Sequence, residues 1–300
     1  MQSPEPSDNR VLGASSSAGA TRARPGWLRF LRQHPTVAVG GIILFLIVAA
    51  AIAAPLLGTA DPTRVNTIMR ARPPSALHWF GTDALGRDLY SRVLYGARIS
   101  LLVGFAVAFL SSIGGLAIGL FAGFSRSADA IAMRVMDGLM SIPPILLAVA
   151  LMALNRGSVG NVIFAITIAE LPRVARLVRG VVLSLREQPY VDAAVTSGTS
   201  LPRIVVMHIL PNTITPMIVQ ATYICASAMI TEAILSFIGA GAPPIVPSWG
   251  NIMAEARALW QVKFYIVMFP ALFLSLTVLA VNLVGDGLRD ALDPRLAKNL

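Results

Sequence analysis

The sequence contains few charged residues and a single cysteine. Charged residues make up 13% of its 300 residues and hydrophobic residues 55%, and the mean hydropathy is +0.71. A composition this apolar excludes an ordinary soluble domain. The lone Cys225 excludes an intrachain disulfide.

Lysine and histidine are also scarce, and this bears on catalysis. Neither Lys263 nor Lys298 follows a glycine-rich phosphate loop, so the chain lacks a G-x-x-x-x-G-K-[ST] site for ATP. His34, His78 and His208 are far apart in the chain, no H-E-x-x-H motif occurs, and one cysteine cannot build a thiolate site. The sequence therefore predicts no catalytic residue, no metal site and no cofactor bound by this chain.

Long hydrophobic runs dominate what remains. A helix needs about 20 apolar residues to cross about 30 Å of hydrocarbon, and only helices or closed barrels satisfy the backbone in lipid. The runs lack the alternation of barrel strands, so we expect an all-α, polytopic integral membrane protein. Six transmembrane helices are predicted, at residues 36–60, 99–124, 138–155, 157–169, 212–231 and 264–285, the fourth of which stops at Glu170.

Basic residues orient these six spans. Lys and Arg are retained on the cytoplasmic side, and the N-terminal tail carries Arg22, Arg24, Arg29 and Arg32. An even number of spans then places both termini in the cytoplasm, in a multi-pass protein of the cytoplasmic (inner) membrane. The net charge of +9 is explained by this topology and by anionic membrane lipid, without a nucleic-acid partner.

The chain divides along these lines. Residues 1–35 are predicted to be a disordered basic cytoplasmic tail that ends in an interfacial segment. A cleaved signal peptide is the alternative, but the hydrophobic run is too long and begins too late. The remaining parts are a first transmembrane helix at 36–60, an extracytoplasmic loop at 61–97, a transmembrane core at 98–287 with a cytoplasmic loop at 190–212, and a cytoplasmic tail at 288–300.

The cytoplasmic loop at 190–212 is polar and punctuated by glycine. Residues 191–197 can form a short helix, and Gly198 can adopt the positive φ that ends it. Thr199 or Ser200 can then cap a second short helix, whose first turn tolerates Pro202 because the amide missing there has no helical partner. The pattern predicts a helix-turn-helix, with an ordinary polar loop as the alternative.

Small side chains in this loop would let another protein approach closely. The segment D-A-A-x-x-x-G followed by H-I-L-P-N closely resembles the coupling loop of ABC importer permeases, specifically the bacterial dipeptide, oligopeptide and nickel permeases. In that family the loop contacts the ATPase. The resemblance therefore implies an ATPase-coupling role for Asp192, Ala193, Ala194, Gly198, His208, Leu210, Pro211 and Asn212.

A second segment, residues 78–101, is similar to the G-T-D-x-x-G-R-D and S-R-x-x-x-G-x-R-x-S-L signature of the second, C-type peptide permease. Its glycines suit tight turns, and its charged residues could pair with one another. We interpret it as a structural loop that fixes the entry of the second span, with direct substrate contact as the alternative. The residues concerned are Gly81, Asp83, Gly86, Arg87, Asp88 and Arg92.

The segments 232–239 and 247–251 resemble the E-A-x-L-S-F-x-G and P-x-W-G block of the same permeases. A carboxylate that faces lipid is costly, so Glu232 should face the bundle interior, a partner subunit or a watery cavity. It is a candidate pathway or interface residue, with a structural hydrogen-bonding role equally open. Residues 282–296 resemble the family too, and Gly285 and Gly287 could end the sixth helix there.

Three features depart from the family or extend beyond it. Asp192 stands where the family usually has Glu, and residues 171–176 lack the expected Trp and Tyr. Arg173, Arg176 and Arg179 recur every third residue, which places them near one side of a helix. We expect them to anchor at lipid headgroups, with phosphates or a partner as alternatives.

Together the resemblances imply the type I ABC importer permease fold. They imply one permease subunit of an ATP-driven importer of di- or oligopeptides, not an enzyme. The implied partners are a homologous second permease, two cytoplasmic ATPase domains or subunits that hold ATP and Mg²⁺, and an extracytoplasmic substrate-binding protein. Nickel or another small solute is the alternative cargo, and a membrane-embedded enzyme is the rival class.

Overall fold

The computed structural model describes residues 34–154 and 157–292. Within these ranges the chain is helical, and β-structure is limited to one isolated bridge between Thr82 and Asp88. The all-α prediction is confirmed. Most of the predicted N-terminal tail and the last eight residues of the predicted C-terminal tail lie outside the described residues.

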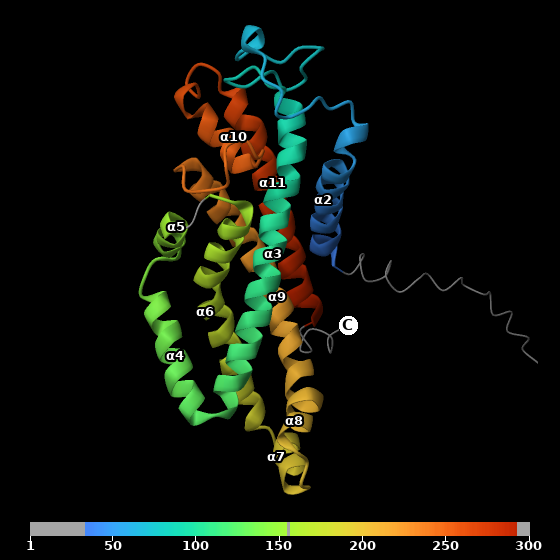
Figure 1. Ribbon diagram of the computed structural model, residues 1–300. Coiled ribbons are helices and arrows are strands. Elements are labelled where there is room, and N and C mark those ends of the chain that lie inside the picture. The colour runs from blue at the N-terminus through green and yellow to red at the C-terminus, as the bar shows by residue number, and fades with distance from the viewer. Residues whose placement is uncertain (1–33, 155–156, 293–300) are drawn as a thin grey trace, which may run out of the picture.

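Five long helices form the bundle and shorter ones connect them (Figure 1). The long helices are α2 (Pro35–Ile52), α3 (Leu89–Phe124), α6 (Val159–Arg186), α9 (Leu210–Phe237) and α11 (Tyr265–Leu292). The shorter ones are α4 (Arg126–Met140), α5 (Pro144–Leu154), α7 (Pro189–Thr196), α8 (Leu201–Ile204) and α10 (Trp249–Glu255), with a π-helical turn at Val205–Ile209.

Each of the six predicted spans overlaps a helix of the structure, but these helices differ in length and in apolar character. In the described part of the chain, four helices are long and apolar enough to cross a membrane: α2, α3, the continuous helix 201–237, and α11. The pair α4 and α5 would be a fifth span, broken by a bend of 91°. The remaining predicted span, residues 157–169, lies in α6, which is not among these helices. It runs on through Glu170 and three arginines to Arg186 and packs against α3.

Several predicted helix boundaries are wrong. The second helix already begins at Leu89, because the Asp88 carboxylate accepts a hydrogen bond from the Ser91 amide and caps it. The first helix ends at Ile52 rather than at residue 60. Gly285 and Gly287 do not end the last helix, which continues to Leu292.

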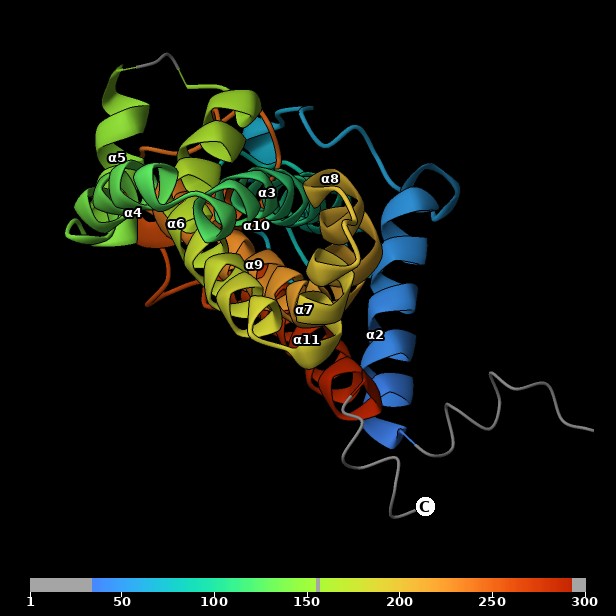
Figure 2. The same cartoon turned by 90° about the horizontal axis from the view of Figure 1, so that it is seen from below.

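Those two glycines instead allow helices to approach. A Cβ on Gly285 would collide with the Thr222 side chain of α9, and a Cβ on Gly287 with Val37 of α2. Gly40 of α2 likewise faces the Ala280 carbonyl of α11, where a Cβ would lie 2.7 Å from the oxygen. As a result α2 packs on α11 at one edge of the bundle, opposite α4 and α5 (Figure 2).

The most extensive contact between two helices in the described part of the chain is between α3 and α6. A Cβ on Gly119 would lie 2.6 Å from the Val178 Cβ and 2.7 Å from the Ala175 carbonyl oxygen. Small residues four apart let membrane helices pack backbone to backbone, where lipid supplies no hydrophobic drive. The stripe consists of Gly115, Gly119 and Gly123 on α3, facing Val174, Val178 and Val182 on α6.

This contact predicts the effect of one added methyl group. Gly119→Ala should destabilise the protein by about 1–3 kcal/mol, because overpacking forces α3 and α6 apart. The control Gly138→Ala has open space around its Cβ and should be neutral or more stable by up to about 1 kcal/mol, the helix-propensity gain. Thermal unfolding of the detergent-purified protein measures both, and equal midpoints for the two variants would contradict the packing described.

Candidate functional site

The loop at residues 190–212 folds as the sequence predicts. The first short helix, α7, runs from Pro189 to Thr196, and Gly198 follows it with φ of 75°. The Thr199 amide donates to the Ala194 carbonyl at 3.0 Å, which closes the left-handed helix end. The second short helix, α8, starts at Leu201 with proline in its first turn, although the Ser200 side chain makes no capping hydrogen bond.

The H-I-L-P-N segment joins this loop to the bundle without a break. The π-helical turn follows α8 directly, and the Leu210 amide at its end donates to the Val205 carbonyl. Pro211 has no amide to donate, and the Asn212 side-chain amide donates to the His208 carbonyl at 2.7 Å. The helix therefore continues from residue 201 to residue 237, whereas the sequence predicted a fifth span beginning at residue 212.

The tip of the loop leaves small and apolar side chains uncovered. Asp192 and Ala193 are exposed, whereas Ala194 is half-buried and packs against the core. The rings of Tyr190 and His208 lie 6.1 Å apart and hold α7 against the π-helical turn. The loop projects from the end of the molecule opposite residues 53–88 (Figure 1). Its exposed apolar residues are Val195, Leu201, Val206 and Met207.

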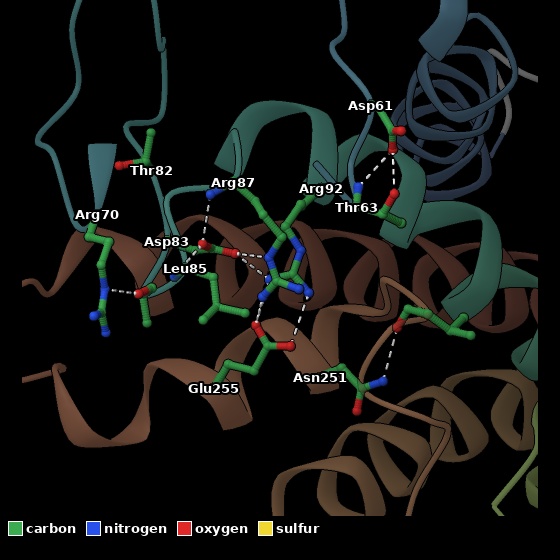
Figure 3. A network of polar contacts seen from close by, with 12 residues as sticks. Asp61, Thr63, Arg70, Thr82, Asp83, Leu85, Arg87, Arg92, Asn251 and Glu255 are labelled. Carbon is green, nitrogen blue, oxygen red and sulfur yellow. Dashed lines mark hydrogen bonds and ion pairs between the residues drawn. The ribbon is translucent and has the colours of Figure 1, made fainter. Parts of the chain in front are cut away.

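At the opposite end of the bundle, four charged side chains form a buried network (Figure 3). The Asp83 carboxylate accepts hydrogen bonds from Arg87 Nε at 2.7 Å and Arg92 Nη1 at 2.5 Å. Glu255 of α10 accepts from Arg92 Nη1 at 2.6 Å and also from Arg87. Two cations thus face two anions, and all but Glu255 are almost fully buried. Such a network is costly to break from one side.

The predicted pairing within this loop is correct for three residues and wrong for one. Asp88 makes no ion pair with either arginine in the part of the chain that the structure describes. It caps α3 and lies 2.9 Å from His78 Nδ1. Gly81 and Gly86 have φ of 80° and 77°, as tight turns require. Sequence reasoning missed Glu255, which lies 163 residues from Arg92 in the chain and in no recognisable motif.

Glu232 is fully buried within the chain's own bundle. Its Oε1 accepts hydrogen bonds from the hydroxyls of Ser236 and Ser248, both at 2.8 Å. Ser248 also caps α10, and the Trp249 indole donates to the Val93 carbonyl of α3 at 3.0 Å. The two sequence segments therefore form one buried joint between α9, α10 and α3. These bonds fit the structural hydrogen-bonding role for Glu232, and its role as a pathway or interface residue stays a prediction.

Arg173, Arg176 and Arg179 of α6 each pair with a carboxylate, and the expectation that they anchor at lipid headgroups stays a prediction. Arg176 Nη2 lies 2.6 Å from Asp137 Oδ1. Arg179 Nη2 lies 2.7 Å from Asp129 Oδ2. Both bonds tie α4 to α6. Arg173 instead bonds within its own helix, to Glu170 at 2.9 Å.

Two family models match this chain. Residues 115–298 match the family described as binding-protein-dependent transport system inner membrane component. Residues 26–74 match the N-terminal transmembrane domain of oligopeptide transport permease C. The chain is an integral membrane component of an ABC transport system. It belongs to the family of binding-protein-dependent transport system inner membrane components.

Similar proteins span nearly the whole chain. The probable peptide ABC transporter permease protein y4tQ of Sinorhizobium fredii is 51% identical, over 95% of this chain and 98% of that protein. The glutathione transport system permease protein GsiD of Pectobacterium atrosepticum is 42% identical, over 91% of each. Among solved structures, the inward-facing MetNI methionine ABC transporter matches 67% of this chain and 96% of its own, with TM-score 0.57 and 19% identity. The type I permease fold is thereby confirmed.

The charged network yields a prediction for Glu255. Glu255→Ala leaves two buried guanidinium groups facing one carboxylate, and should lower the free energy of unfolding by about 3 kcal/mol. Asp61→Ala is the control, since Asp61 is an exposed carboxylate of the same loop whose hydrogen bonds go to the neighbouring Thr63, and should change stability by less than about 0.5 kcal/mol. Thermal unfolding distinguishes them, and a Glu255→Ala midpoint equal to that of Asp61→Ala would refute the role given to the network.

Proposed function

We propose that this chain is one permease subunit of an ATP-driven importer of di- or oligopeptides. The cargo is proposed because similar permeases are named for peptides, dipeptides and glutathione. The single observation that supports the coupling role is the loop at residues 190–212. It is a short helix-turn-helix with an exposed apolar tip, joined without a break to a helix that extends to residue 237.

The complex would comprise this chain, a homologous second permease, two cytoplasmic ATPase domains or subunits and an extracytoplasmic substrate-binding protein. ATP and Mg²⁺ would be held by the ATPases, and this chain would supply no covalent chemistry. Closure of the ATPases would displace the loop. A helix of 37 residues extends about 55 Å at 1.5 Å per residue, so the displacement would reach the far end of the bundle.

The docking surface would combine close approach with apolar contact. Ala193 has no side chain beyond Cβ and lies exposed on α7, so a partner can approach the helix backbone there. Val195 and Leu201 expose 57% and 54% of their surface on either side of the Gly198 turn. Apolar side chains gathered on a projecting tip are typical of a protein interaction site.

Two alternatives concern the cargo and the class. Nickel or another small solute is the alternative cargo, since specificity can reside in the binding protein. A membrane-embedded enzyme would require convergent catalytic groups at one depth. Family membership as a transport-system membrane component supports the permease over the enzyme.

Reconstitution of the complete complex tests the function and the coupling loop together. Proteoliposomes with the wild-type permease, supplied with the binding protein, should accumulate a labelled dipeptide when given ATP, and should not accumulate nickel. Gly198→Val should abolish most uptake, because a β-branched residue at φ of 75° costs at least about 1–2 kcal/mol. Ala193→Trp should do so by blocking docking.

The control separates coupling from assembly. Gly180→Val changes a glycine of α6 around which there is open space, and it should retain ATPase binding and uptake. Pull-down of the ATPases and ATPase activity are measured alongside transport. Normal ATPase binding and full uptake in both loop variants would rule out this loop as the ATPase contact.

The orientation is proposed with both termini and residues 190–212 in the cytoplasm and residues 81–91 outside. The two loops lie at opposite ends of the bundle (Figure 1), which supports opposite sides of the membrane. Single cysteines at Ser200 and Ala84, introduced into a Cys225→Ala background, should react with a membrane-impermeant maleimide only from inside and only from outside, respectively. Labelling of position 200 from outside in sealed cells would contradict the proposed orientation.

A further inference from the structure

A charged pair lies in the middle of the bundle, away from the coupling loop and the buried joint. Glu170 is near the middle of α6, with 3% of its surface exposed. Its Oε1 accepts a hydrogen bond from Ser227 Oγ of α9 at 3.0 Å, and its Oε2 accepts from Arg173 Nη1 at 2.9 Å. Ionisable residues at such a position are costly and mark functional sites rather than lipid-facing surface.

Arg173 differs from the two arginines that follow it on α6. Arg176 and Arg179 reach carboxylates of α4, whereas the ion pair of Arg173 is with its own helix, and half of its side chain is exposed. A guanidinium group has five N–H donors, and Glu170 accepts from one of its nitrogens. Donors remain for a ligand.

These donors adjoin an open pocket. Glu170 and Arg173 line a cavity of about 430 Å³ between α5, α6, α9 and α11. This volume lies within the range of about 300–1,000 Å³ that is typical of small-molecule sites. Its wall also carries Ser227, Asn282 and the apolar Ile230, so polar groups and apolar surface are both available to a peptide.

We propose that this pocket is a transport subsite for the carboxylate of a peptide, bound by the free N–H groups of Arg173 while Glu170 and Ser227 hold the guanidinium in place. The inference rests on the proposed peptide import. Arginine binds a carboxylate through two parallel hydrogen bonds, which gives direction as well as attraction. Glu170 already neutralises Arg173, so an arriving carboxylate meets a weak net field, and a transported ligand must be able to leave.

A phospholipid phosphate is an anion that the same guanidinium could bind. Lipid headgroups gather at the ends of membrane helices, whereas Arg173 lies 14 residues after the start of α6 and 13 before its end. On α9 the pocket wall comes from residues 223–234, in the second half of that helix. The position of Arg173 midway along α6 favours a translocated substrate.

Uptake by the complete complex in proteoliposomes tests the subsite, with saturating binding protein and labelled alanyl-alanine. Arg173→Gln should lower uptake by about tenfold to a hundredfold, the expected loss for a charged hydrogen-bond donor, with assembly retained. Arg173→Lys, which keeps the charge but not the paired donors, should be intermediate. The double variant Glu170→Gln with Arg173→Gln keeps the site neutral, so it should assemble and still lose uptake. Arg176→Gln is the matched control and should transport at the wild-type rate.

Direct binding tests the chemistry without the binding protein. Saturation-transfer NMR on the purified complex should detect alanyl-alanine with wild-type permease and not with Arg173→Gln. Alanyl-alanine amide, which lacks the carboxylate, should bind neither. Equal binding of the dipeptide and its amide to the wild type would overturn the subsite.

The remaining outcomes separate this inference from the proposed function. A wild-type complex that imports no peptide would overturn the function and the subsite with it. Wild-type import with undiminished uptake in Arg173→Gln and in the double variant would overturn the subsite alone. Loss of bound phospholipid from Arg173→Gln, measured as phosphorus in the purified complex, with uptake unchanged, would assign the pocket to a lipid headgroup instead.

Discussion

Internal neutralisation of charge is the constraint on which the rest of this structure depends. The bundle is too apolar to solvate an isolated charge, so buried ionisable groups must find partners in the protein. The buried Asp83 joins Arg87 and Arg92 at one end, and the half-buried Arg179 joins Asp129 near the other. The Arg179–Asp129 pair also links α6 to α4. The pairs therefore help to fix the relative positions of the elements that carry them.

Close packing supplies what charge does not. In lipid, apolar side chains gain little by leaving the solvent, so helices associate where their backbones can approach. Gly119 and its neighbours bring α3 against α6, and Gly40 brings α2 against α11. These contacts place α6, with its charged face, between α3 and the pocket. The charged pairs and the pocket thus lie on helices that are held together by contacts at small residues.

Much of this arrangement could be predicted from sequence because it is local. The spans follow from apolar runs, and the turns at Gly81, Gly86 and Gly198 follow from residues that accept positive φ. The contribution of Glu255 could not be predicted, since its partners are distant in the chain and a lone carboxylate carries no pattern. The role of Gly285 could not be predicted either, because a glycine near a helix end can either stop the helix or admit a neighbour, and only the tertiary contact with Thr222 decides.

The π-helical turn at Val205–Ile209 affects the direction in which α7 and α8 project from α9. An α-helix advances about 100° in azimuth per residue, since 3.6 residues complete a turn. A π-helical turn holds an additional residue, so it offsets α8 and everything before it by about that angle relative to an uninterrupted helix. These five residues therefore set the angular position of Leu201 and Asp192 around the axis of α9. Deleting one of them would leave both short helices intact and aim them at a different side of the molecule.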